Sequence, residues 1–297
     1  MNLLRSKSRQ RTTLVLDNGV ARIVTGHRNG ISYWQTIPLA PHSMEEGVVR
    51  DPQALGEALG AFFASERLPT RDIVTCVSGS QAFNRVFTLP AVRTEDLKNA
   101  VVYQAKREMP VPLEDLVFTW QVIEENEEEY RIFSVGVQRD AVSTFMDALS
   151  ASGVRPRSLD VRPLALARVI DHPRALLGNI EADSVDIIYL LDRSPVLIRT
   201  VYFPDRAVAV QDSVERFADE LQRSSRSYND ANRFSPIDYS APLFITGGMG
   251  DYATMAGALY GLVDHTIERF ESPIPHPEDF PSEAYATNIG LLLKGAG

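Results

Sequence analysis

Cysteine is nearly absent from the sequence, which contains only Cys76. A single thiol cannot form a disulfide within the chain, and this scarcity is typical of proteins in a reducing compartment. Cys76 lies in the apolar run IVTCVSG, so we expect it to be a small buried hydrophobic side chain.

Long hydrophobic runs are absent too. No stretch approaches the ~18 apolar residues that a membrane-spanning helix needs. The first residues, MNLLRSKSRQR, lack the apolar segment of a signal peptide. We therefore expect a soluble cytoplasmic protein.

Sequence signals for covalent catalysis and for histidine-bound metals are missing as well. The five histidines are scattered without ligand spacing. The serines of VSGSQ (77–81) are not in a nucleophile elbow. In ITGGMGDYATM (245–255), no lysine follows the glycines as a phosphate-binding Walker loop requires.

The sequence contains fewer basic than acidic residues, 30 against 39. The net charge of −9 argues against a nucleic-acid or anionic-membrane surface. Residues 1–11 are an exception, because they form a basic arm that is either a solvated tail or a contact for lipid headgroups. The 297 residues, 44% of them hydrophobic, suffice for two packed lobes.

The order of predicted elements defines a first lobe and an insertion. Strands at 14–16 and 21–24 flank the turn Asp17-Asn18-Gly19, which is a strong hairpin signal. A strand at 31–38, a helix at 52–65 and a strand at 72–78 follow. The insertion contains strands at 83–89, 117–123 and 131–137, helices at 94–106 and 141–152, and an acidic hairpin tip at 124–130.

The chain then returns to the first lobe through a strand and a helix at 156–170. The second lobe contains a hairpin over 184–203, a helix at 214–228, a strand at 243–250, and helices at 252–260 and 285–293. The predicted division is a tail (1–11), a first-lobe core (12–82 with 155–175), an inserted α+β subdomain (83–154) and a second lobe (176–297).

Two glycine-containing turns are candidate phosphate sites. The turn at Asp17 and Gly19 offers backbone N–H groups to a phosphate and a carboxylate to Mg²⁺, or it is an ordinary hairpin turn. The second turn contains three glycines after a buried strand and before a helix; it approaches a ligand closely or simply permits tight packing. Those glycines are Gly247, Gly248 and Gly250. Glu220 and Arg223 share one helical face and are either ligand contacts or a solvated surface.

Together, the Asp-x-Gly turn, the two hairpin-led lobes and the late strand–GGxG–helix resemble the actin/Hsp70-type ATPase superfamily. The segment FNRVFTLPAVRTEDLKNAVVYQAKREMPVPLEDLVFTWQVI (83–123) resembles the PilM family of type IV pilus assembly. The segments 136–169, 217–229 and 284–295 are similar to later parts of that family, so the resemblance spans nearly the whole chain.

This resemblance implies an α/β protein with the two-lobe, FtsA-like form of the actin fold. It also implies ATP and Mg²⁺ between the lobes, with Asp17, Gly19, Glu220, Arg223, Gly247, Gly248 and Gly250 at the nucleotide and Asp17 at the metal. A groove of the first lobe and the insertion would take the N-terminal cytoplasmic tail of PilN, an inner-membrane protein. The protein would then be cytoplasmic and held at the inner membrane by its partners.

Both phosphate loops depart from the family pattern. Val20, Ala21 and Arg22 stand where a hydroxyl is usual after Gly19. In GNIEADSVDIIYL (178–190), Glu181 takes the place of a glycine and would repel phosphates, although Glu181 or Asp183 could instead hold a metal. We therefore expect weak or absent ATP binding and no main role as an enzyme.

The leading prediction is an adaptor of a type IV pilus or type II secretion-like machine that binds a PilN-like peptide and no nucleic acid. The alternatives are an active ATPase or small-molecule kinase of the same superfamily, with Asp17 as the one obvious base, and a self-associating filament protein. MNLLRSK also contains the Asn-Leu-Leu expected of the partner peptide. It would occupy a neighbour's groove, or the match is chance.

Overall fold

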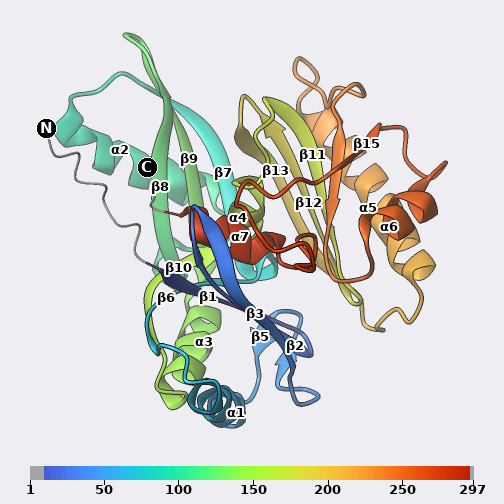
Figure 1. The fold of residues 1–297 in the computed structure, drawn as a ribbon. Helices are drawn as coiled ribbons and strands as arrows, with labels where there is room; N and C mark the ends of the chain where they lie inside the picture. The colour runs from blue at the N-terminus through green and yellow to red at the C-terminus, as the bar shows by residue number, and fades with distance from the viewer. Residues whose placement is uncertain (1–9, 295–297) are drawn as a thin grey trace, which may run out of the picture.

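Two five-stranded sheets, one in each lobe, form the frame of the molecule (Figure 1). The computed structural model describes residues 10–294, so the proposed peptide-like segment MNLLRSK lies outside the described residues. The strand orders are β10-β6-β1-β2-β3 in the first lobe and β13-β12-β11-β14-β15 in the second. In each sheet an antiparallel three-stranded meander adjoins two parallel strands.

The first lobe is built around the predicted hairpin. Its elements are β1 (Arg11–Asp17), β2 (Val20–His27), β3 (Gly30–Pro38), β4 (Met44–Glu45), β5 (Val48–Val49), α1 (Pro52–Ser65), β6 (Arg71–Val77), β10 (Arg155–Val161) and α4 (Arg162–Ala167). Arg11 belongs to β1, not to the predicted basic tail, and its Nη1 donates to the carbonyl of Lys294 at 2.7 Å.

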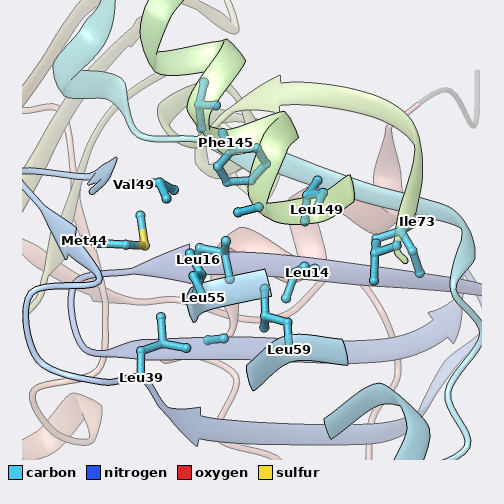
Figure 2. Close-up of a cluster of buried hydrophobic side chains, with 14 of the residues drawn as sticks. Leu14, Leu16, Leu39, Met44, Val49, Leu55, Leu59, Ile73, Phe145 and Leu149 are labelled. Atoms are coloured by element: carbon cyan, nitrogen blue, oxygen red, sulfur yellow. The ribbon is translucent and has the colours of Figure 1, made fainter. Parts of the chain in front are cut away.

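Helix α1 shows how the sequence sets the local structure. Asp51 caps its N-terminus by accepting a hydrogen bond from the Ala54 N–H at 2.9 Å, and Pro52 supplies the fixed φ of the first turn. Its buried residues Leu55 and Leu59 lie in one core cluster with Leu14 of β1 (Figure 2). Burying each leucine contributes about 2 kcal/mol, so this face holds the helix on the sheet.

The segment predicted as an insertion, residues 83–154, contains an antiparallel sheet of order β7-β9-β8 and two helices, but the second helix, over residues 139–151, packs on α1 in the core of the first lobe. This region consists of a 3-10 turn η1 (Gly79–Gln81), β7 (Ala82–Pro90), α2 (Thr94–Glu108), a second 3-10 turn η2 (Leu113–Asp115), β8 (Leu116–Glu125), β9 (Glu129–Gln138) and α3 (Arg139–Ala151). These elements match the strands and helices predicted for residues 83–152. The β8–β9 hairpin extends well beyond the body of the first lobe (Figure 1).

The second lobe contains β11 (Arg174–Ile180), β12 (Ser184–Leu191), β13 (Ser194–Tyr202), α5 (Val210–Ala231), β14 (Leu243–Thr246), α6 (Tyr252–Leu259) and β15 (Ile267–Arg269). The predicted hairpin over 184–203 corresponds to β12 and β13. The sequence prediction missed β11, although β11 is the central strand of this sheet. The hairpin that opens this lobe is therefore β11–β12.

The last helix, α7 (Ala286–Leu293), contacts α4, β1, β2 and β6 of the first lobe. Asn288 is fully buried there, and its Nδ2 donates to Thr13 Oγ1 and to the Arg22 carbonyl, both at 3.1 Å. The sequence prediction assigned residues 176–297 to the second lobe. The structure instead packs residues 286–293 against the first.

Two further sequence predictions concern burial and membranes. Cys76 is buried as expected, and burial raises the pKa of its thiol. Within residues 10–294, no helix is long and apolar enough to cross a membrane.

Candidate functional site

A cleft of about 500 Å³ lies between the two lobes. The turn after β1 and part of β3 line it from the first lobe, and the turn after β11 and the loop after β14 line it from the second. This position brings together the two candidate phosphate turns of the sequence, since both Asp17 and Gly248 border the cleft.

The β1–β2 turn is a tight hairpin in which the polar groups of Asn18 and the Gly19 carbonyl are hydrogen-bonded. Gly19 has a φ of 80°, a backbone conformation that favours glycine. The Asn18 side chain accepts a hydrogen bond from the Gly47 N–H at 3.2 Å, and the Asn18 carbonyl accepts one from Arg206 at 2.8 Å. Arg206 also comes so near that a Cβ on Gly19 would lie 2.8 Å from its Nη1. The arginine thus covers the turn.

Asp17 is paired with a buried arginine that contacts both lobes. Arg162, at the start of α4, places Nη1 2.7 Å from Asp17 Oδ2 and Nε 2.9 Å from Asp186 Oδ2 of β12. All three side chains are at most 4% exposed. Burial lowers the pKa of Arg162, but Asp17 and Asp186 outweigh it, so this pKa lies well above its ordinary value.

Hydroxyl groups complete this buried cluster. Tyr202 donates to Asp17 Oδ1 at 3.2 Å, and Thr200 donates to Asp186 Oδ1 at 2.6 Å. Burial raises the pKa of Asp186, while Arg162 acts in the opposite direction. A guanidinium therefore lies between two carboxylates from opposite lobes. Its positive charge offsets their mutual repulsion, as a bound cation would do if the arginine were absent.

The two departures from the phosphate-loop pattern, Arg22 and Glu181, contact each other. Arg22 Nη1 and Nη2 donate to Glu181 Oε1 and Oε2 at 2.9 and 2.8 Å, a bidentate pair across the cleft. Their side chains are 10% and 11% exposed. Burial raises the pKa of Glu181, with the charge of Arg22 opposing it.

This ion pair lies directly against the second glycine turn. A Cβ added to Gly248 would collide with Arg22 Nη2 and lie 2.8 Å from Glu181 Oε2. Any ligand that approached the Gly248 backbone would have to displace the pair. Asp17 would likewise have to exchange Arg162 for a metal ion, so the residues present do not fit a magnesium nucleotide as they stand.

The structure brings together some of the predicted site residues and separates others. Asp17, Gly19 and Gly248 lie at the cleft. Gly247, with a φ of 118°, lies against the backbone of Ile180, and Gly250 is close to Val210 and Thr254. Their roles in nucleotide binding remain predictions.

The remaining pair, Glu220 and Arg223, lies outside the cleft. Glu220 accepts a hydrogen bond from Arg199 of β13 at 3.0 Å, and Arg223 Nη1 is 3.7 Å from Glu220 Oε2. Neither residue borders the interlobe cleft.

Sequence reasoning missed Arg162, Asp186, Tyr202 and Arg206. Arg162 stands between a strand and a proline that opens a short helix, so its sequence context gives no sign of burial. Asp186 lies within an apolar strand, DIIYLL, and a charge inside such a run was the available signal. Within residues 10–294, no group of three or more His, Cys, Asp or Glu side chains could hold a metal ion.

The two-lobe architecture is that of the actin-like ATPase fold. A protein of that fold from Bacteroides thetaiotaomicron, of unknown function, is similar with a TM-score of 0.52 at 9% identity over 98% of both chains. The cytoplasmic domain of EpsL from Vibrio cholerae, an inner-membrane component of its type II secretion system, also has a TM-score of 0.52, at 13% identity over 97% of this chain and 99% of that one.

The PilM–PilN type IV pilus biogenesis complex contains a chain similar to this one with a TM-score of 0.76, at 20% identity over 98% of this chain and 99% of that one. The family model of the type IV pilus assembly protein PilM matches residues 24–200, which is more than half of the sequence. The chain belongs to the PilM family.

Proposed function

We propose that this protein is a cytoplasmic adaptor of a type IV pilus or type II secretion-like assembly complex and binds the N-terminal tail of a PilN-like inner-membrane protein. Nucleotide binding is weak or lost. Family membership and the similarity to a PilM–PilN complex support the partner. The Arg22–Glu181 pair beside Gly248 supports the weak or lost nucleotide binding, because this pair occupies the space that a phosphate would need.

Electrostatics favour the same conclusion. Each carboxylate at the cleft already has a cationic partner from this chain. Arg162 pairs with Asp17 and Asp186, Arg22 with Glu181, and Arg206 Nη1 lies 3.8 Å from Asp183 Oδ2. Breaking such pairs leaves buried charges uncompensated, at a cost of about 3–5 kcal/mol. A nucleotide would have to offset this cost before it gained any affinity.

The insertion offers apolar surface for a peptide. Tyr103 is 66% exposed, Val117 43% and Met146 36%, and all three lie within residues 83–154. Exposed large apolar side chains are frequent at docking sites for short peptides. We place the tail where the insertion meets the first lobe, and this contact would hold the protein at the inner membrane.

Calorimetric titration of the full chain with Mg-ATP, Mg-ADP and a synthetic PilN-like tail peptide tests both parts. We expect micromolar peptide binding and no nucleotide binding up to millimolar concentration. Tyr103→Glu with Met146→Glu should weaken the peptide at least tenfold, whereas Tyr260→Glu, at an 88% exposed site of the second lobe, should not.

The other outcomes identify the rival functions. Micromolar Mg-ATP binding would refute the occupied-cleft proposal and favour a working ATPase or kinase. Polymerisation of the isolated protein, with no peptide binding, would favour a filament protein.

A further inference from the structure

The insertion and the second lobe face each other with open sheet edges. β7 is the edge of the three-stranded sheet, and β13 is the edge of the second-lobe sheet. Within residues 10–294, no backbone hydrogen bond joins the central part of either outer edge to another segment. Open edges of this kind pair readily with an added strand.

A groove of about 570 Å³ separates these two edges. Residues 84–88 of β7 form one wall, and residues 196–198 of β13 form the other. Tyr228, near the end of α5, and Arg131 of β9 also line it. The prolines of these strands, Pro90 and Pro195, lie outside the two walls, so every residue of the walls retains its backbone N–H.

The groove is basic, although the protein as a whole is acidic with a net charge of −9. Its lining includes Arg85 and Arg131 and no acidic residue. Glu124 of β8 lies 3.5 Å from Arg131 Nη1, whereas Arg85 donates only to the carbonyls of Glu108 and Asn84 and has no acidic partner among these contacts. A second hollow of about 450 Å³ shares Leu197, Ile198 and Tyr228 with it and adds Arg199 and Arg223. Glu220, the one acid there, is already paired with both of those arginines.

The apolar side chains of the groove suit an extended chain. Val86, Val196 and Ile198 are half-buried and leave part of their surface open. In a strand, alternate side chains point to opposite faces. A chain with apolar residues on one face and carboxylates on the other would pair its backbone with an edge and its charges with the arginines.

We propose that the groove between β7 and β13 is a second peptide-docking site and takes an extended acidic segment of a partner protein by strand addition. This site lies between the insertion and the second lobe, apart from the exposed residues assigned above to the PilN-like tail. A ligand there would add to the contacts between these two parts of the molecule, which already meet where η1 and β7 touch β13.

The probe is a phage library of random dodecapeptides, selected on the full-length protein and in parallel on its Arg85→Glu/Arg131→Glu variant. We expect the wild-type protein to enrich proline-free sequences that alternate apolar residues with aspartate or glutamate. Synthetic peptides of the consensus should bind wild type at least tenfold more tightly than the variant. Arg28→Glu, an exposed loop site outside the groove, is the matched control and should leave binding unchanged.

Three results would overturn the proposal. The first is the absence of any sequence enriched on wild type over the variant. The second is equal affinity of the consensus peptide for both proteins. The third is competition between that peptide and the PilN-like tail, which would mean one site instead of two. Because the tail is titrated separately, failure of this groove is distinguishable from failure of the adaptor function.

Discussion

Arg22 of the first lobe and Glu181 of the second form a bidentate ion pair across the cleft, at 2.8 and 2.9 Å, although 159 positions separate them in the chain. Each residue is a departure from a phosphate-binding loop. The two departures compensate each other, because each residue neutralises the charge of the other. This relationship predicts strong energetic coupling between the two positions.

A double-mutant cycle measures that coupling. Arg22→Ala and Glu181→Ala should each lower the free energy of unfolding by about 3 kcal/mol, because each leaves a nearly buried charge unpaired. The double variant should lose less than the sum, with a coupling of about 1–3 kcal/mol by urea denaturation. The control cycle is Arg193 with Asp171, which are 64% and 89% exposed, and its coupling should stay below about 1 kcal/mol. Additive losses at Arg22 and Glu181 would contradict the prediction.

Arg162→Met tests the buried cluster. Removing the guanidinium leaves the Asp17 and Asp186 carboxylates facing each other without compensation, so we expect a loss of about 3–5 kcal/mol in unfolding free energy. Adding Asp186→Asn to that variant should recover part of the loss, because it removes one of the two opposed charges. A loss below about 1 kcal/mol for Arg162→Met would show that the cluster does not hold the lobes together.

The Asp183 carboxyl predicts a pH dependence. Burial raises its pKa, and the neighbouring charge of Asp17 adds to the effect. A carboxyl whose pKa is raised by folding contributes stability below its unfolded pKa of about 4, and that contribution is lost as pH rises through the folded pKa. Asp183→Asn should therefore gain stability relative to wild type between pH 4 and pH 7, measured by urea unfolding at both values. A constant or shrinking difference would be inconsistent with the raised pKa.

Two helical glycines give a matched pair of substitutions. A Cβ on Gly290 of α7 would overlap the Ala165 carbonyl of α4, whereas a Cβ on Gly257 of α6 would meet nothing within 4 Å. Gly290→Ala should cost about 3 kcal/mol by overpacking. Gly257→Ala should add about 1 kcal/mol through helix propensity. Thermal unfolding of both variants checks this, and similar effects at the two sites would refute the close packing of α7 on α4.

Local signals explain most of the fold that the sequence predicted. The Asp17-Asn18-Gly19 turn fixed the first hairpin, and the helical spacing of apolar residues over 52–65 predicted α1. β11 was missed because RALLGNI is a short apolar run without alternation, and a central strand buried on both faces lacks the period that identifies a strand. Its role depends on pairing with β12 and β14, which is tertiary information.

The site was less predictable for the same reason. Arg22 and Glu181 were recognised as departures from the pattern, but nothing local shows that they form a pair. Arg162 gave no signal, because its burial depends on carboxylates 145 and 24 positions away. Glu220 and Arg223 share a helical face, as expected, yet that face is turned toward β13.

The position of α7 constrains when the protein becomes complete during synthesis. α7 is almost wholly buried, and it covers the sheet that begins at Arg11. More than a hundred residues separate it from α4, the preceding element of the same lobe. At about 5–20 residues per second, the ribosome needs several seconds to make that stretch. Until α7 has been made, the apolar surface of β1 and α4 has no cover. The first lobe is therefore begun first but completed last. The nascent chain is most exposed to aggregation in this interval.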